Sequence, residues 1–169
     1  MAKKVDRVSE RELVISRTID APRELVWEVW TNPDHIKEWW GPKGFTSTIH
    51  QMDVRPGGVW NYIMHGPDGT NYNNKSIYKE VIKPEKLVYD HISSPRFQFT
   101  ALFIEQGEKT IVNIQMLFNS KEDKQKVIMD FGVNKGLKQT TARLAKYAEH
   151  FCKKENIIHH KKINRNAKS

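Results

Sequence analysis

Six consecutive segments in the middle of the chain alternate apolar with polar side chains, and turn-forming residues separate each segment from the next. Two of them lie on either side of a turn at residues 106–108, and the four before them span residues 45–54, 59–65, 71–82 and 87–92. Successive side chains of a strand point to opposite faces of a sheet, so this alternation predicts six strands. Because the connections are short, we expect the strands to form an antiparallel meander.

Signals for one more strand and two short helices precede the meander. Residues 12–19 are rich in β-branched side chains and predict a strand. Pro22 fits the first turn of a helix, and a second helix is expected to start near Pro33 and to end before Gly41. The sequence therefore places two short helices between the first and second strands.

The segment after the meander predicts one long helix, from Ser120 to about Phe151. Gly132 and Gly136 lie inside it, and each weakens a helix by about 1 kcal/mol relative to Ala. We therefore expect these glycines to mark a bend or the close approach of another backbone. A single apolar stripe with spacings of three and four gives the helix its buried face: Val133, Leu137, Thr141, Leu144, Ala148 and Phe151.

Composition and charge exclude several classes of protein. The single cysteine, Cys152, leaves no internal disulfide and no Cys-based zinc site. No apolar run approaches the roughly 20 residues of a membrane-spanning helix, and residues 1–12 lack the apolar stretch of a secretion signal. We expect a cytoplasmic protein with one domain, residues 1–152.

The net charge of +8 is concentrated in a C-terminal tail, residues 153–169, which carries six Lys or Arg against one Glu. The tail is expected to be solvated and without regular structure. Nucleic-acid binding through it is the alternative, because basic segments attract polyanions. For the body of the chain we expect no nucleic-acid partner.

No catalytic or metal-binding constellation is evident in the sequence. A phosphate-binding loop, a dinucleotide fingerprint and a nucleophile elbow are all missing. His50 and His65 make a poor zinc site without a nearby carboxylate or Cys. Asp90 and His91 are neighbours on a strand and point to opposite faces, so we interpret His91 as an ordinary strand residue. No catalytic residue, metal or cofactor is expected.

A set of short motifs occurs in a distinctive order along residues 11–151. They are the segments 21–27 (APRELVW), 31–33 (TNP), 39–42 (WWGP), 53–60 (DVRPGGVW), 66–69 (GPDG), 78–81 (YKEV) and 84–88 (PEKLV). In this order the chain resembles the family of homologues of the activator of Hsp90 ATPase, within the START/Bet v 1-like, helix-grip (SRPBCC) superfamily. It departs from the family pattern in the last helix, where many relatives have a Gly-Trp pair and this chain has Gly136 and Leu137.

The resemblance implies an α+β helix-grip fold, in which a curved antiparallel sheet wraps around the long C-terminal helix and leaves a cavity. It implies binding of a hydrophobic small molecule, such as a lipid or a polyketide-like compound, in that cavity. Two alternatives remain open: a co-chaperone-like protein-interaction domain, and a cyclase- or hydrolase-type enzyme. The second lacks a paired acid and base in the sequence.

The strand alternation and the helix stripe predict which side chains face the cavity. Either these large side chains fill the space, or they line a true apolar pocket. Glu80 is either a desolvated cavity carboxylate or a surface group near Lys79 or Lys83. Trp39 and Trp40 either plug one end of the core or form a lid. The full predicted set is Trp39, Trp40, Trp60, Tyr62, Met64, Tyr78, Glu80, Phe99, Phe103, Met116, Phe118, Leu137 and Leu144.

Overall fold

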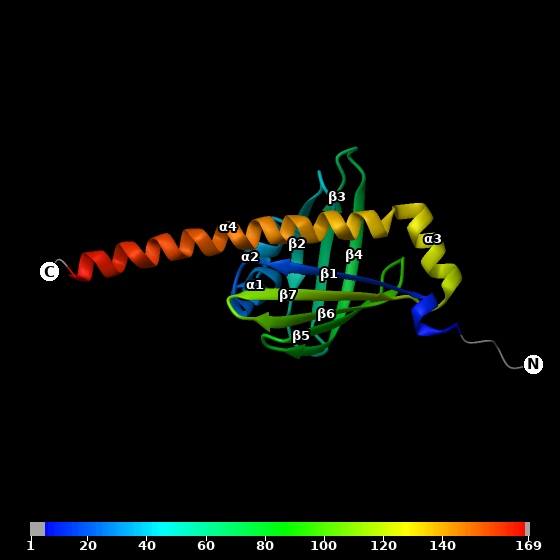
Figure 1. Cartoon of the computed structure of the whole chain (residues 1–169). Coiled ribbons are helices and arrows are strands. Elements are labelled where there is room, and N and C mark those ends of the chain that lie inside the picture. Colours follow the sequence, from blue (N-terminus) through cyan, green and yellow to red (C-terminus); the bar gives the residue numbers. More distant parts are fainter. Residues whose placement is uncertain (1–5, 168–169) are drawn as a thin grey trace, which may run out of the picture.

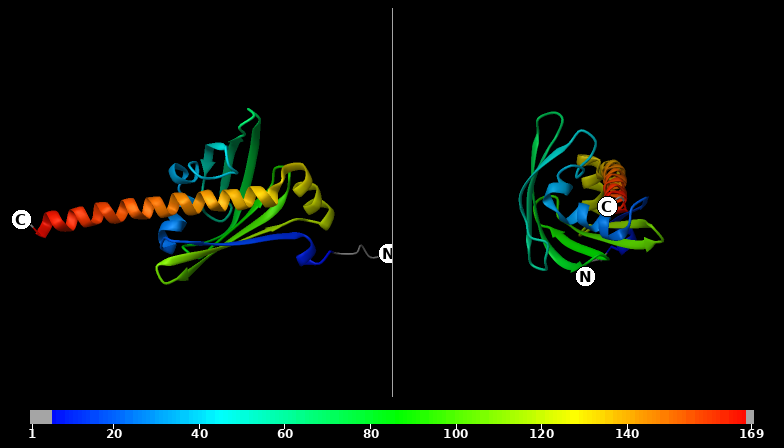
Figure 2. Two further views of the ribbon diagram at one scale, coloured as in Figure 1. Left: turned by 45° about the horizontal axis from the view of Figure 1, so that its top comes forward. Right: turned by 90° about the vertical axis from the view of Figure 1, so that its left-hand side faces the viewer.

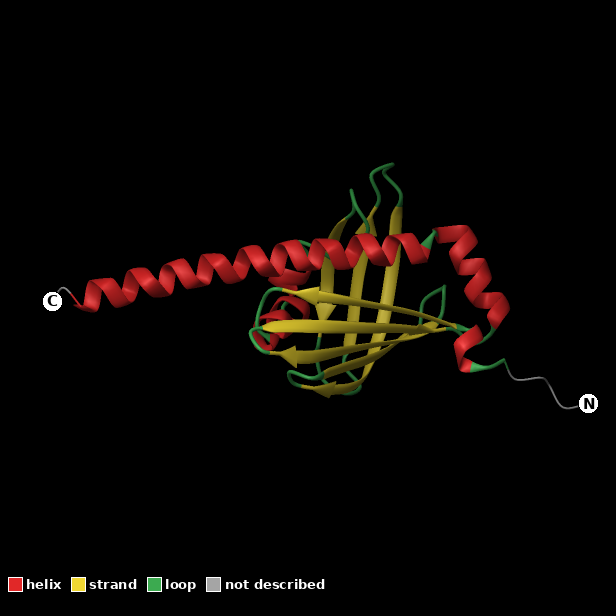
Figure 3. Ribbon diagram, in the orientation of Figure 1, coloured by secondary structure: helices red, strands yellow, loops and turns green. Residues whose placement is uncertain are grey.

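A seven-stranded antiparallel sheet with helices on its concave side makes up the body of the protein (Figures 1 and 3). The computed structural model describes residues 6–167, apart from the side chains of residues 157–162 and 167. The strands are β1 (Glu12–Ile19), β2 (Thr46–Met52), β3 (Val59–His65), β4 (Asn71–Ile82), β5 (Lys86–His91), β6 (Phe97–Gln106) and β7 (Lys109–Leu117).

The strand order is β1-β7-β6-β5-β4-β3-β2, so every strand from β2 to β7 pairs with its neighbour in sequence. This confirms the predicted meander. β1 forms one edge of the sheet and pairs with β7, with Glu12 opposite Leu117 and Ile19 opposite Thr110. A view along the last helix shows the sheet curving around it (Figure 2, right). The predicted α+β class with a curved sheet around a long helix is confirmed.

Two short helices follow β1, as predicted: α1 (Arg23–Thr31) and α2 (Pro33–Ile36). Asn32 separates them, and its side-chain oxygen accepts a hydrogen bond from the backbone N–H of Asp34 at 3.0 Å. α1 is amphipathic and buries Val26, Trp27, Val29 and Trp30. A short 3₁₀ helix, η1 (Val8–Glu10), precedes β1.

The long helix predicted from Ser120 onward is two helices, α3 (Lys121–Phe131) and α4 (Val133–Ala167). Gly132 lies between them with φ +58°, a left-handed conformation that costs little only for glycine. Gly136 has a different role, because a Cβ at this position would lie 3.2 Å from Cγ of Pro42. One glycine therefore marks the bend, and the other marks a close approach.

The basic C-terminal tail continues α4 through Ala167, which corrects the expectation of an irregular segment. Residues 137–167 contain no Gly or Pro that would end a helix. The side chains of residues 153–156 and 163–166 are exposed. α4 projects well beyond the sheet at its C-terminal end (Figures 1 and 2).

Candidate functional site

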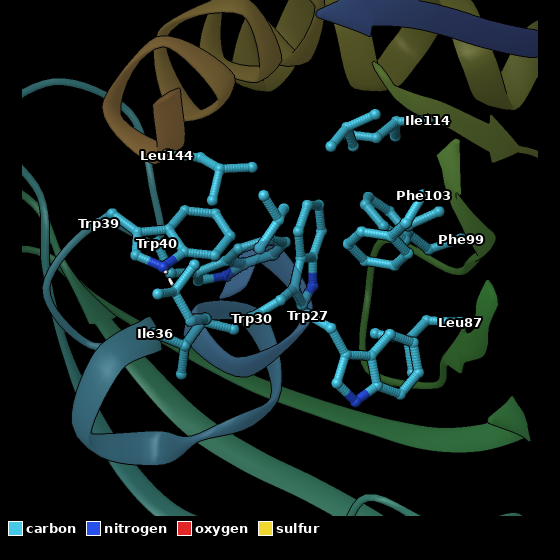
Figure 4. Close-up of a cluster of buried hydrophobic side chains, with 14 of the residues drawn as sticks. Trp27, Trp30, Ile36, Trp39, Trp40, Leu87, Phe99, Phe103, Ile114 and Leu144 are labelled. Atoms are coloured by element: carbon cyan, nitrogen blue, oxygen red, sulfur yellow. Dashed lines mark hydrogen bonds between the residues drawn. The ribbon is translucent and has the colours of Figure 1, made fainter. Parts of the chain in front are cut away.

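One end of the concave face of the sheet is filled by tryptophans (Figure 4). The ring of Trp27 meets Phe103 edge-on at 5.4 Å, and Trp30 meets Phe103 at the same distance. Trp39 lies 5.0 Å from Trp30 and donates its indole N–H to the carbonyl of Val29 at 3.0 Å. Side chains from α1 and from the turn after α2 therefore occupy the space between the sheet and α4 at this end.

The other end of the concave face is hollow. A cavity of about 540 Å³ lies between the sheet, α3 and α4. Its apolar wall comes from the loop after α2, from β3, β5, β6 and β7, and from both long helices. It includes Trp40, Phe45, Tyr62, Met64, Tyr89, Phe97, Phe99, Met116, Val127, Val133 and Leu137.

A few polar side chains also line the cavity. Asn74 lies on β4 opposite Tyr62 and faces the hollow, whereas Asn71 and Asn73 alternate with it and point to the other face, where Asn71 bonds to His65. The other polar residues of the lining are His91, Ser94, Asp130 and Thr140. An apolar hollow with a few polar groups is the usual form of a small-molecule site.

The predicted cavity residues divide into two groups in the structure. Six line the cavity: Trp40, Tyr62, Met64, Phe99, Met116 and Leu137. Another six are buried in the packed core and do not line it: Trp39, Trp60, Tyr78, Phe103, Phe118 and Leu144. Both interpretations of the aromatics therefore apply, each to one end of the concave face.

Glu80 does not face the cavity, which corrects its placement among the predicted residues. The pairing of β4 with β5 shifts register between Tyr78 and Glu80. This irregularity breaks the alternation that would have put both side chains on one face. Glu80 is exposed, and its carboxylate lies 3.0 Å from Nζ of Lys86.

The two adjacent tryptophans have separate places. Trp39 is buried in the filled end, as its contacts with Trp30 and Val29 show. Trp40 forms the boundary between the two ends, since its ring contacts Trp30, Trp60 and Phe99 and also lines the cavity. This arrangement favours the plug over the lid.

Arg143 on α4 holds the backbone beside Trp40. Its Nη1 donates to the carbonyls of Gly41 and Pro42 at 2.9 and 3.0 Å, and its Nη2 donates to the carbonyl of Glu38 at 3.3 Å. The same loop meets α4 at Gly136, where Pro42 makes its close approach. These contacts fix the loop that separates the filled end from the cavity.

Several wall residues were not among those predicted, and His91 is the one with ionisable chemistry and the most hydrogen bonds. Its Nδ1 lies 2.7 Å from the carbonyl oxygen of Pro95, and its Nε2 lies 2.8 Å from Oδ1 of Asn74. The ring stacks on Phe97 at 4.5 Å. Burial lowers the pKa of His91, and the backbone carbonyls of Pro95 and Ser93 oppose part of that effect. The sequence pattern that could have placed His91 on the cavity side is strand alternation, which puts Leu87, Tyr89 and His91 on one face of β5.

Two tyrosines on the wall keep their protons at any ordinary pH. Burial raises the pKa of Tyr62 well above its usual range, and a side-chain hydrogen bond with Trp40 opposes this only weakly. Burial also raises the pKa of Tyr89, and Coulombic repulsion from Tyr62 and Tyr78 adds to it. Both phenols are therefore neutral groups in the cavity wall.

In the part of the chain that the structure describes, no three His, Cys, Asp or Glu side chains are grouped so that they could hold a metal ion. Within the same residues, no helix is both long and apolar enough to cross a membrane.

A curved antiparallel sheet that grips a long helix and encloses a hollow defines the helix-grip class of START/Bet v 1-like proteins. The sequence profile of the Activator of Hsp90 ATPase homolog 1-like proteins matches residues 20–149. The chain belongs to this family.

Solved structures share the fold. A protein from Arthrobacter aurescens aligns with a TM-score of 0.78 at 22% identity, covering 89% of this chain and 93% of that one. A protein from Nitrosomonas europaea gives 0.74 at 22% identity, covering 84% and 96%. An AHSA1-like protein from Aeromonas hydrophila gives 0.62 at 20% identity, covering 82% and 93%. A comparison with curated proteins finds no match.

Proposed function

We propose that this protein binds an apolar small molecule in the cavity between the sheet, α3 and α4. The observation that carries the proposal is a hollow of about 540 Å³ whose wall is mostly aromatic and aliphatic. Small-molecule sites typically occupy about 300–1,000 Å³ and have this composition. The size and the composition of the hollow therefore both fit a small-molecule site.

The wall supports binding rather than catalysis. His91 is the histidine in the cavity lining and the first candidate for acid–base chemistry there. Its two ring nitrogens are already in contact with the oxygens of Pro95 and Asn74. These contacts tie β5, β4 and the loop after β5 together at the edge of the cavity. His91 therefore serves to shape the wall.

The ligand is expected to enter beside α3. This helix buries only Val127, while Met129 is 84% exposed and Phe131 is 56% exposed. Segments with few buried apolar groups open at low cost in free energy. Phe131 and Val127 also line the cavity, so movement of α3 would widen its entrance.

Titration of the full chain with N-phenyl-1-naphthylamine, an uncharged fluorescent probe, tests the proposal. We expect saturable binding with a rise in probe fluorescence. Leu137→Trp should abolish it, because a larger ring at this position enters the cavity from α4. Ala142→Trp adds a similar ring at an exposed position of the same helix and should leave binding unchanged.

Two results would contradict the proposal: no probe binding by the parent protein, or equal binding by the parent and Leu137→Trp. Native mass spectrometry of protein purified from its own cells would then identify any ligand that stays bound.

A further inference from the structure

Apart from Asp130, the polar side chains that line the cavity carry no charge at neutral pH. Asn74 stands on β4, Ser94 in the loop after β5, and Thr140 on α4. Among the described residues that line the cavity, none is Lys or Arg. His91 adds no cation at neutral pH, because burial moves its pKa further below neutrality.

The one ionised side chain in that lining is a carboxylate at the mouth. Asp130 is exposed on α3, next to Phe131. A ligand carboxylate drawn inward would pass this negative charge and lose water without meeting a cation. Burying an unpaired ion is far more costly than burying a neutral polar group that finds hydrogen bonds.

We infer that the cavity selects an amphiphile whose polar group is uncharged, such as an alcohol or a ketone, over one that ends in a carboxylate. The Asn74 amide bonds to the Tyr72 carbonyl and to His91, and it keeps one N–H and one oxygen lone pair for such a group. The Thr140 hydroxyl donates to the carbonyl of Gly136, and its oxygen can still accept a hydrogen bond. The inference rests on the proposed function and adds the chemistry of the ligand's polar end.

A second hollow of about 350 Å³ adjoins the mouth of the main cavity. It is the alternative place for the carboxylate of a ligand whose apolar part lies in the main cavity. It shares Asp130 and Phe131 with the main cavity, and it has charged groups of both signs. Arg96 and Lys126 supply the cations, and Asp123 and Asp130 supply the carboxylates. The cations are thus matched by anions of equal number.

The test compares two ligands of equal length, decan-1-ol and decanoate, as competitors for N-phenyl-1-naphthylamine on the full chain at pH 8. Both are used below the concentrations at which they aggregate. We expect decan-1-ol to displace half of the probe at a concentration at least about tenfold lower than decanoate, the cost of desolvating an unpaired charge.

Variants separate the charge of the site from the better hydration of decanoate in water. Asp130→Asn should improve displacement by decanoate severalfold and leave decan-1-ol unchanged. Glu122→Gln makes the same change of charge at an exposed position of α3 outside both linings, and should affect neither ligand.

Three outcomes would overturn the inference while the proposed function stands. Decanoate could bind as tightly as decan-1-ol. Asp130→Asn and Glu122→Gln could improve decanoate binding equally. Arg96→Gln could weaken decanoate binding alone, which would place its carboxylate in the second hollow. If neither the probe nor either ligand binds, the proposed function itself fails.

Discussion

The two ends of the same concave face differ in what covers them. At the filled end, α1 places Trp27 and Trp30, and the turn after α2 places Trp39, between the sheet and α4. At the hollow end, α3 is the covering helix and contributes chiefly Val127 and Phe131. A sheet wrapped around one helix leaves space along its whole length, and the short helices decide which part of that space closes. Function is therefore expected at the end without them.

Removing a tryptophan from the filled end should have the largest effect. Trp30 is 2% exposed and contacts Trp39, Trp40, Phe99 and Phe103. Trp30→Ala should lower the free energy of unfolding by about 3–5 kcal/mol in urea denaturation, because it opens a cavity in a packed core. A loss below about 1 kcal/mol would show that this end is not tightly packed.

The boundary between the two ends depends on Arg143. Its guanidinium donates to three backbone carbonyls, and the single ammonium of a lysine cannot span them. Arg143→Lys should destabilise the fold by about 1–3 kcal/mol and weaken probe binding. Lys138→Arg, at an exposed position of the same helix, should change neither. If Arg143→Lys bound the probe with unaltered affinity, the loop that Arg143 holds would not shape the cavity.

The wall at the hollow end should give the protein a pH dependence through His91. Because burial lowers its pKa in the folded state, the unfolded state binds more protons as the pH falls. Stability is therefore fully present above the ordinary histidine pKa of about 6.5. Below it, stability falls by at most about 1.4 kcal/mol per pH unit, until the lower folded-state pKa is reached.

Denaturation of the parent, His91→Gln and His50→Gln between pH 7.5 and 5 measures this contribution. His91→Gln should show a shallower loss of stability than the parent. His50 is exposed, so its variant should follow the parent curve. If the free energy of unfolding fell with pH at the same rate in all three proteins, His91 would not be the source of the pH dependence.

Strand alternation was sufficient to predict the order and inward faces of the meander, because each side chain's direction follows from its position in a strand. Glu80 was misplaced because a register irregularity after Tyr78 depends on the partner strand. For Gly132 the sequence allowed either a bend or the close approach of another backbone, and the positive φ of the residue shows that it is a bend. The division of the inward aromatics into core and cavity wall depends on where α1 and α2 lie across the sheet. Strand alternation gives the face of each side chain but not the position of these helices.

One pair of substitutions on α4 tests the contrast between the two ends most directly. Leu137 lines the cavity, and Leu144 lies seven residues later in the filled end, fully buried (Figure 4). The measurement is the free energy of unfolding of Leu137→Trp and Leu144→Trp relative to the parent. Overpacking should make Leu144→Trp less stable, at the upper end of about 1–3 kcal/mol, whereas Leu137→Trp should lose less than about 1 kcal/mol because its ring enters empty space. Equal and large losses in both variants would contradict the account, since the hollow end would then be as full as the other.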